Sequence, residues 1–101
     1  MWAQLIKVQV KAGTDLTALT DLLKAAEQPE SGLVRELVMH DQDNPDSVYV
    51  LAMFESEEKA RERERDPRRA EGQQRVQAFL AGALAGPPEF VDLVVTTEWA
   101  P

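Results

Sequence analysis

The protein has 101 residues, 44% of them hydrophobic and 29% charged, and a formal net charge of -7 at pH 7. This length predicts a single domain over residues 1–101, and the negative charge argues against nucleic acid and anionic membranes as partners. The absence of cysteine excludes disulfides, thiolate nucleophiles, iron–sulfur clusters and zinc sites that need sulfur. The strand-like start, without a signal-like or membrane-spanning segment, predicts a cytoplasmic protein, and the abundance of alanine and arginine is typical of GC-rich bacteria.

The first two predicted elements are a strand and a helix. Residues 2–11 alternate apolar and polar side chains, which predicts a half-buried strand. Gly13 breaks this pattern, and either Thr14 or Asp15 can cap a helix whose apolar residues recur at steps of three and four. Pro29 is predicted to end this helix.

Two strands joined by a turn come next. Gly32 opens a predicted strand that runs to Asp41, and a further strand is predicted over residues 48–55. The segment between them, residues 41–46, is rich in aspartate, asparagine and proline, which favour turns. Because a parallel crossover needs a much longer connection, we predict an antiparallel hairpin.

A second helical region and a last strand complete the chain. Ser56, followed by two glutamates, predicts a helix start, and Asp66 with Pro67 interrupts that helix and can cap a new one. The helical pattern continues to Gly86, and residues 90–99 alternate as a strand does. The order predicts an α+β, ferredoxin-like βαββαβ fold, in which a four-stranded antiparallel sheet carries two helices on one face.

The opposite sheet face is predicted to be uncovered and partly apolar. The side chains expected there are Lys7, Gln9, Tyr49, Leu51 and Met53. This is too much apolar area to leave comfortably in water, and a second copy of the chain would cover it. We therefore predict a homodimer.

Six arginines crowd the second helical region: Arg61, Arg63, Arg65, Arg68, Arg69 and Arg75. Acidic side chains are interleaved with them along the same region and cancel their field. We therefore interpret this arginine cluster as a solvated helix face and not as a surface that binds nucleic acid.

Four short segments mark the element boundaries: Lys11-Ala12-Gly13, Asp43-Asn44-Pro45-Asp46, Met53-Phe54-Glu55-Ser56-Glu57-Glu58 and Gly86-Pro87-Pro88-Glu89-Phe90. With this order of elements, the chain resembles the dimeric α/β-barrel superfamily, and within it the antibiotic biosynthesis monooxygenase-like domain, over nearly its whole length. The resemblance implies a paired α/β barrel with a pocket between the sheet and the second helix. It marks architecture more than activity.

The superfamily includes oxygenases that oxidise aromatic compounds without metal or flavin, and haem-degrading oxygenases. The haem-degrading branch uses an asparagine on the first strand and a tryptophan and a histidine on the second helix. The corresponding places are occupied here by Ile6, Arg63 and Gln73. The second helical region contains no histidine or tryptophan at all, so the resemblance argues against haem degradation.

His40 is the only histidine and the candidate catalytic residue. It lies near the predicted end of the second strand beside Asp41, and an imidazole paired with a carboxylate can act as a general base. The simpler interpretation is a surface residue that leads into the turn. One histidine without cysteine leaves only carboxylates as metal ligands, so we predict no metal site and no cofactor.

Aromatic and polar side chains are candidates for binding a small aromatic or hydrophobic ligand. The predicted substrate-binding residues are Tyr49, Phe54, Arg69, Gln73 and Phe79. Core packing is the competing interpretation for Phe54 and Phe79, while Trp2 and Trp99 near the chain ends are candidates for an interface.

Two functions are compatible with this pattern. The first is a cofactor-independent monooxygenase that acts on a small aromatic compound. The second is a non-enzymatic homodimer that binds a small ligand or serves as an interaction module. A cavity with convergent polar groups would favour the enzyme, and a core filled by aromatic side chains would favour the module.

Overall fold

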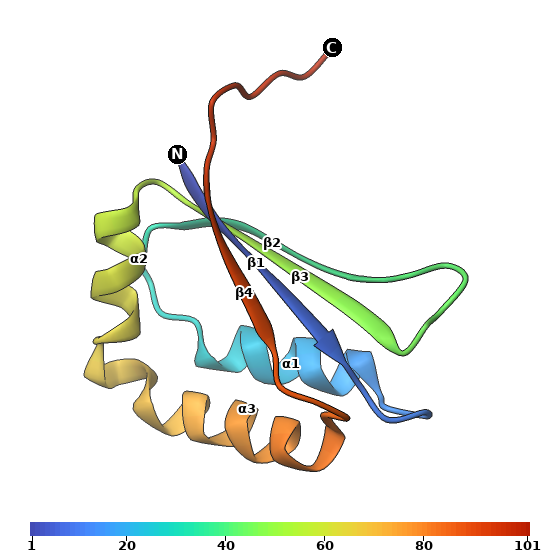
Figure 1. The fold of residues 1–101 in the computed structure, drawn as a ribbon. Coiled ribbons are helices and arrows are strands. Elements are labelled where there is room, and N and C mark those ends of the chain that lie inside the picture. Colours follow the sequence, from blue (N-terminus) through green and yellow to red (C-terminus); the bar gives the residue numbers. More distant parts are fainter.

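One antiparallel sheet forms the centre of the computed structural model, which describes residues 1–101. Its strands are β1 (Trp2–Gln9), β2 (Leu33–His40), β3 (Ser47–Phe54) and β4 (Glu89–Val94), arranged in the order β2-β3-β1-β4. The helices are α1 (Leu16–Ala26), α2 (Glu57–Glu64) and α3 (Ala70–Ala83), with a single 3-10 turn, η1 (Pro67–Arg69), before α3. Figure 1 shows α1 and α3 lying across one face of the sheet, with α2 at the end where β3 leaves it. The predicted ferredoxin-like fold is confirmed.

Local signals place most of these elements. The Asp15 carboxylate accepts hydrogen bonds from the backbone of Thr17 and Ala18 and begins α1, so Asp15 and not Thr14 is the cap. Ser56 begins α2 and Asp66 begins η1 in the same way. The predicted interruption at Asp66 is confirmed, and it divides the second helical region into α2 and α3.

Two predicted boundaries are too long, and tertiary pairing explains one of them. The last strand was expected to reach Trp99, but it ends at Val94, which lies opposite Trp2 at the start of β1. Beyond that point β4 has no partner, and after one hydrogen bond from Val95 to the Met1 carbonyl the chain runs away from the sheet (Figure 1). Helix α1 ends at Ala26, before Pro29.

The core is divided into two clusters along the helix-facing side of the sheet. One contains Trp2, Ala52, Phe54 and Ala60, and the other contains Val10, Val48 and Val50. Only 13 of the 101 residues are buried, which is few for a domain of this length. Space is therefore left between the clusters, beneath the middle of the sheet.

Pairing in the sheet determines which side chains face away from the helices. Tyr49 lies opposite both Lys7 and Met39, and Leu51 lies opposite both Leu5 and Leu37, all on this second face. No element of the chain covers it: Leu37 is 40% exposed, Met39 40% and Leu93 37%. The uncovered, partly apolar sheet face is confirmed.

No helix is long and apolar enough to span a membrane.

Candidate functional site

A cavity of about 300 Å³ lies between the sheet and the helices. Both core clusters border it, since Trp2 and Phe54 line one part and Val8 and Val50 another. Of its 20 lining residues 13 are hydrophobic. The charged and amide side chains that line it are Gln4, Glu36, Arg63, Glu64, Arg69 and Gln73.

Two of the four charged lining residues are neutralised by partners outside the cavity. Arg63 forms an ion pair with Glu27 at 3.2 Å, between side chains that are 13% and 29% exposed. Glu64 forms an ion pair with Arg61 at 3.0 Å. The remaining two, Glu36 and Arg69, form no ion pair, although they carry opposite charges. The cavity therefore contains one free carboxylate and one free guanidinium.

Arg69 is buried, with 8% of its surface exposed. Its Nη1 donates to the Arg63 carbonyl at 3.4 Å and its Nη2 donates to the Gln73 amide oxygen at 3.3 Å. Its Nε–H has no acceptor. Burial and the nearby positive charge of Arg63 lower the pKa of Arg69. Leaving a buried donor unpaired costs about 1–3 kcal/mol, so a ligand oxygen that reached this Nε–H would be stabilised by it.

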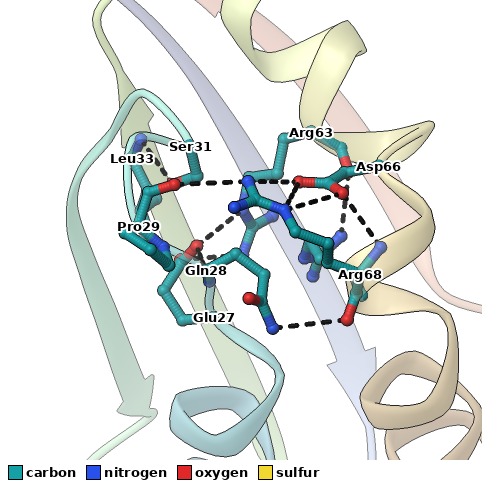
Figure 2. A network of polar contacts seen from close by, with 9 residues as sticks. Glu27, Gln28, Pro29, Ser31, Leu33, Arg63, Asp66 and Arg68 are labelled. Atoms are coloured by element: carbon teal, nitrogen blue, oxygen red, sulfur yellow. Dashed lines mark hydrogen bonds and ion pairs between the residues drawn. The ribbon is translucent and has the colours of Figure 1, made fainter.

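A polar network holds the backbone of Arg69 in place. Figure 2 shows this network between the loop that follows α1 and the junction of α2 with η1. Arg68 donates to the Asp66 carboxylate at 2.7 Å and to the Pro29 carbonyl at 3.3 Å, and Gln28 donates to the Arg68 carbonyl at 3.3 Å. The junction and the loop each donate a hydrogen bond to the other, and these bonds fix the backbone beside Arg69.

Glu36 was not among the predicted site residues. It lies on β2 opposite Ala52, on the face that the helices cover, and it lines the cavity. Burial raises the pKa of its carboxyl above the ordinary 4.5, while the positive charge of Arg63 acts in the opposite direction. The available signal was a charged residue two positions from Val38, in phase with the inward side of the strand.

The prediction that the arginine cluster is a solvated face is wrong for three of its members. The Arg61 guanidinium lies 5.1 Å from the centre of the Trp2 ring, and the Arg63 guanidinium lies 5.5 Å from that of Phe54. Arg69 is buried. Because Ala60 is the only buried residue of α2, the long arginine stems take the place of apolar side chains in covering the sheet. The other three arginines are exposed, as expected.

The structure brings together some of the predicted site residues and separates others. Phe54, Arg69 and Gln73 line the cavity. Tyr49 lies on the opposite sheet face, and Phe79 is half-buried on α3 without lining the cavity. Phe54 belongs to the core as well as to the cavity wall, since it packs against Trp2 with ring centres 5.9 Å apart.

His40 does not lie in the cavity and does not pair with the carboxylate of Asp41. Its side chain is exposed and its Nδ1 lies 3.3 Å from the backbone carbonyl of Asp41. The Asp41 carboxylate instead accepts hydrogen bonds from the backbone of Asp43 and Asn44 in the turn. The structure thus supports the simpler interpretation of His40. No three histidine, aspartate or glutamate side chains are grouped as metal ligands.

The two tryptophans differ in their surroundings. Trp2 is buried in the core, so its predicted place at an interface is wrong. Trp99 is exposed at the end of the chain, after the last strand. The difference follows from pairing, because Trp2 lies between β3 and β4 whereas Trp99 has no strand partner.

A groove of about 290 Å³ on the outer side of the α2–α3 junction adjoins the cavity. It shares three lining residues with the cavity: Glu64, Arg69 and Gln73. These side chains therefore lie between the groove and the cavity.

Several solved proteins share this fold. A mutant of SnoaB, a cofactor-independent oxygenase from Streptomyces nogalater, matches with a TM-score of 0.70 and 14% identity over 96% of this chain and 94% of that one. A candidate antibiotic biosynthesis monooxygenase from Chloroflexus aurantiacus matches with a TM-score of 0.71 and 20% identity over 99% and 98% of the two chains. A Nitrosomonas europaea protein of unknown function matches with a TM-score of 0.69 and 20% identity over 99% and 93%.

No family model matches the sequence, and no curated protein matches it significantly. The likeness to these solved structures confirms the predicted resemblance at the level of the fold. At such identities it establishes the fold alone, so activity has to be argued from the cavity.

Proposed function

We propose that this protein is a small-molecule enzyme that oxidises a small aromatic compound without a cofactor. The cavity supports this proposal, since its volume and its apolar lining with a few polar groups are typical of ligand sites. The observation that carries it is the buried, unpaired Nε–H of Arg69, a residue that lines the cavity. The fold that the chain shares with a cofactor-independent oxygenase agrees with it.

The chemistry requires little from the protein. An aromatic compound with an acidic C–H group loses a proton, and the resulting carbanion reacts with dioxygen, which is the oxidant. A methylene carbon then becomes a carbonyl carbon: it gains one oxygen atom and loses two hydrogens, which leave with the other oxygen atom as water. In this proposal Phe54 contacts the aromatic ring, while Arg69 and Gln73 donate hydrogen bonds to its oxygens. His40, Tyr49 and Phe79 lie outside the cavity, and this proposal gives them no part in the reaction.

A hydroxyanthrone, whose methylene group is acidified by a carbonyl and two aromatic rings, is a suitable test substrate. We expect the protein to raise the rate of dioxygen consumption above the rate without protein, and labelled dioxygen to deliver one atom to the product. Gln73→Leu should lower this rate by about a hundredfold, the lower end of what loss of one positioned hydrogen-bond donor costs. Gln77→Leu, one helical turn further on and outside the cavity, is the matched control.

The non-enzymatic alternative has a different outcome. If the protein bound the hydroxyanthrone without accelerating dioxygen consumption, it would be a binding module and the oxygenase proposal would be wrong.

We also propose that two copies pair through their uncovered sheet faces. The support is the apolar character of the face around Leu51, Leu37 and Met39, which no part of the chain covers. A small domain with few buried residues gains stability when such a face is buried. The helices and the cavity stay outside this contact, because they lie on the other side of the sheet.

A further inference from the structure

We propose that Glu36 and Arg69 act together on a bound enol or phenol: the Glu36 carboxylate takes the acidic proton, and the Nε–H of Arg69 holds the oxygen of the resulting anion. This assignment rests on the proposed function and names its base and its substrate class. The substrate class is a neutral, weakly acidic aromatic compound, which ionises only after it has entered the cavity.

The charged residues that line the cavity differ in whether they form ion pairs. Arg63 and Glu64 are each bound to a partner of opposite charge, whereas Glu36 and Arg69 are bound to none. Both of these residues line the same cavity, yet they do not form an ion pair with each other. Burying a charge without a partner costs free energy, and such charges are typical of sites where a ligand supplies the missing partner.

The surroundings of Glu36 suit a base. Its carboxylate accepts no hydrogen bond from the protein, and burial raises its pKa toward the range in which a carboxylate abstracts protons efficiently. The charged groups that face it from the packed elements are Glu27 at the end of α1, Arg63 on α2 and Arg69 at the start of α3. Glu27 is engaged with Arg63, so Arg69 is the cation left to stabilise a new anion.

The proton transfer conserves the total charge of the cavity. The proton moves from the ligand to a Glu36 oxygen, which becomes a neutral carboxylic acid, and the electron pair stays on the ligand. Delocalisation places that charge on the ligand oxygen, which accepts the hydrogen bond from Arg69. A ligand that enters as a permanent anion would instead be repelled by ionised Glu36, and we expect it to bind more weakly than a neutral phenol.

Binding of para-nitrophenol tests this step directly, because its anion absorbs at a longer wavelength than the neutral form. Below the pKa of the free phenol, we expect the anion band to grow as the wild-type protein is added, with an ionised fraction about tenfold above that of the free phenol, equivalent to one pKa unit. Arg69→Met should remove the band. It should weaken binding of para-nitroanisole, the methyl ether that cannot ionise, much less than binding of para-nitrophenol.

Proton release identifies the acceptor. In the wild-type protein the proton stays on Glu36, so calorimetric titrations in buffers of different ionisation enthalpy should show no proton released to buffer. In Glu36→Gln, one proton should be released for each phenolate that forms. Glu71→Gln, which changes an ion-paired acid on α3 outside the cavity, is the matched control and should behave as the wild type does.

Two results would overturn the assignment. The first is a bound phenol that stays neutral in the wild-type protein. A purely structural pair would show this result, and the losses of unfolding free energy in Glu36→Gln and Arg69→Met would then be coupled in the double variant. The second is equal proton release by the wild type and Glu36→Gln. A phenol that ionises as described without dioxygen consumption would instead end the oxygenase proposal and leave the Glu36–Arg69 assignment standing.

Discussion

Gly72 determines how closely two helices approach beneath the cavity. A Cβ at this position of α3 would lie 2.7 Å from the Cα of Ala26 on α1. Because that atom belongs to the backbone, the helices would have to move apart. Gly82 lies on the same helix, but a Cβ there meets no heavy atom within 4 Å.

We predict opposite effects for the same substitution at these two glycines. Gly72→Ala should lower the free energy of unfolding by about 1–3 kcal/mol through overpacking. Gly82→Ala should raise it by about 0.5 kcal/mol, because alanine favours the helix and nothing obstructs it. Chemical denaturation measures both, and a stable Gly72→Ala protein would mean that α1 and α3 are not in close contact.

At the scale of elements, one ion pair links the end of α1 to α2. Glu27 and Arg63 form this link, and Arg63 also lines the cavity. Burial is the largest single influence and acts to raise the pKa of Glu27. Hydrogen bonds from Arg63, Gln28 and Ser31, together with the positive charge of Arg63, outweigh it and lower the pKa below the ordinary 4.5. A carboxylate whose pKa is lower in the folded state stabilises that state above its unfolded pKa, and the contribution is lost as the pH falls through its folded pKa.

Glu27→Gln should therefore destabilise the protein at neutral pH. We expect a loss of about 1–2 kcal/mol, between the values typical of exposed and buried pairs. The difference from the wild type should shrink as the pH falls below 4.5. Thermal unfolding over a pH series is the measurement, and a loss that does not depend on pH would contradict the ion-pair explanation.

The matched control is Glu71→Gln. Glu71 forms an ion pair with Arg75 within α3, but the two side chains are 79% and 63% exposed. Water and salt screen such a pair, so the loss should be no more than about 0.5 kcal/mol. An equal effect of both variants would show that burial of the Glu27 pair is unimportant.

At the scale of the whole molecule, the prediction concerns its association. The apolar face around Leu51 requires cover, and sedimentation velocity at micromolar concentration should show a dimer. Leu51→Glu places a charge at the centre of that face and should give a monomer. Val94→Glu adds the same charge at an exposed position on the other side of the sheet and should leave the dimer intact. A monomeric wild-type protein would contradict this prediction.

Local patterns were sufficient to predict the order of the elements. Alternation at period two marked β1 and β4, an apolar face marked β3, and Gly32 with the polar turn bounded β2. Ser56 and Asp66 marked helix starts, because their side chains accept hydrogen bonds from the backbone N–H groups of Lys59 and Arg68. Within the site, Phe54 was predicted from its residue type, and Arg69 and Gln73 from residue type and position in the second helical region. These features depend on neighbours within a few residues, and the linear sequence contains them.

Features that depend on distant partners could not be predicted in this way. The end of β4 at Val94 follows from where β1 begins, and the place of Glu36 in a cavity follows from the helices that cover its face of the sheet. The buried state of Arg69 and its unpaired Nε–H depend on three segments meeting at the α2–α3 junction. The sequence pattern of alternating charges along a helix is the same whether the side chains point into water or into a cavity. Only the packing of the helices against the sheet distinguishes a solvated face from a candidate site.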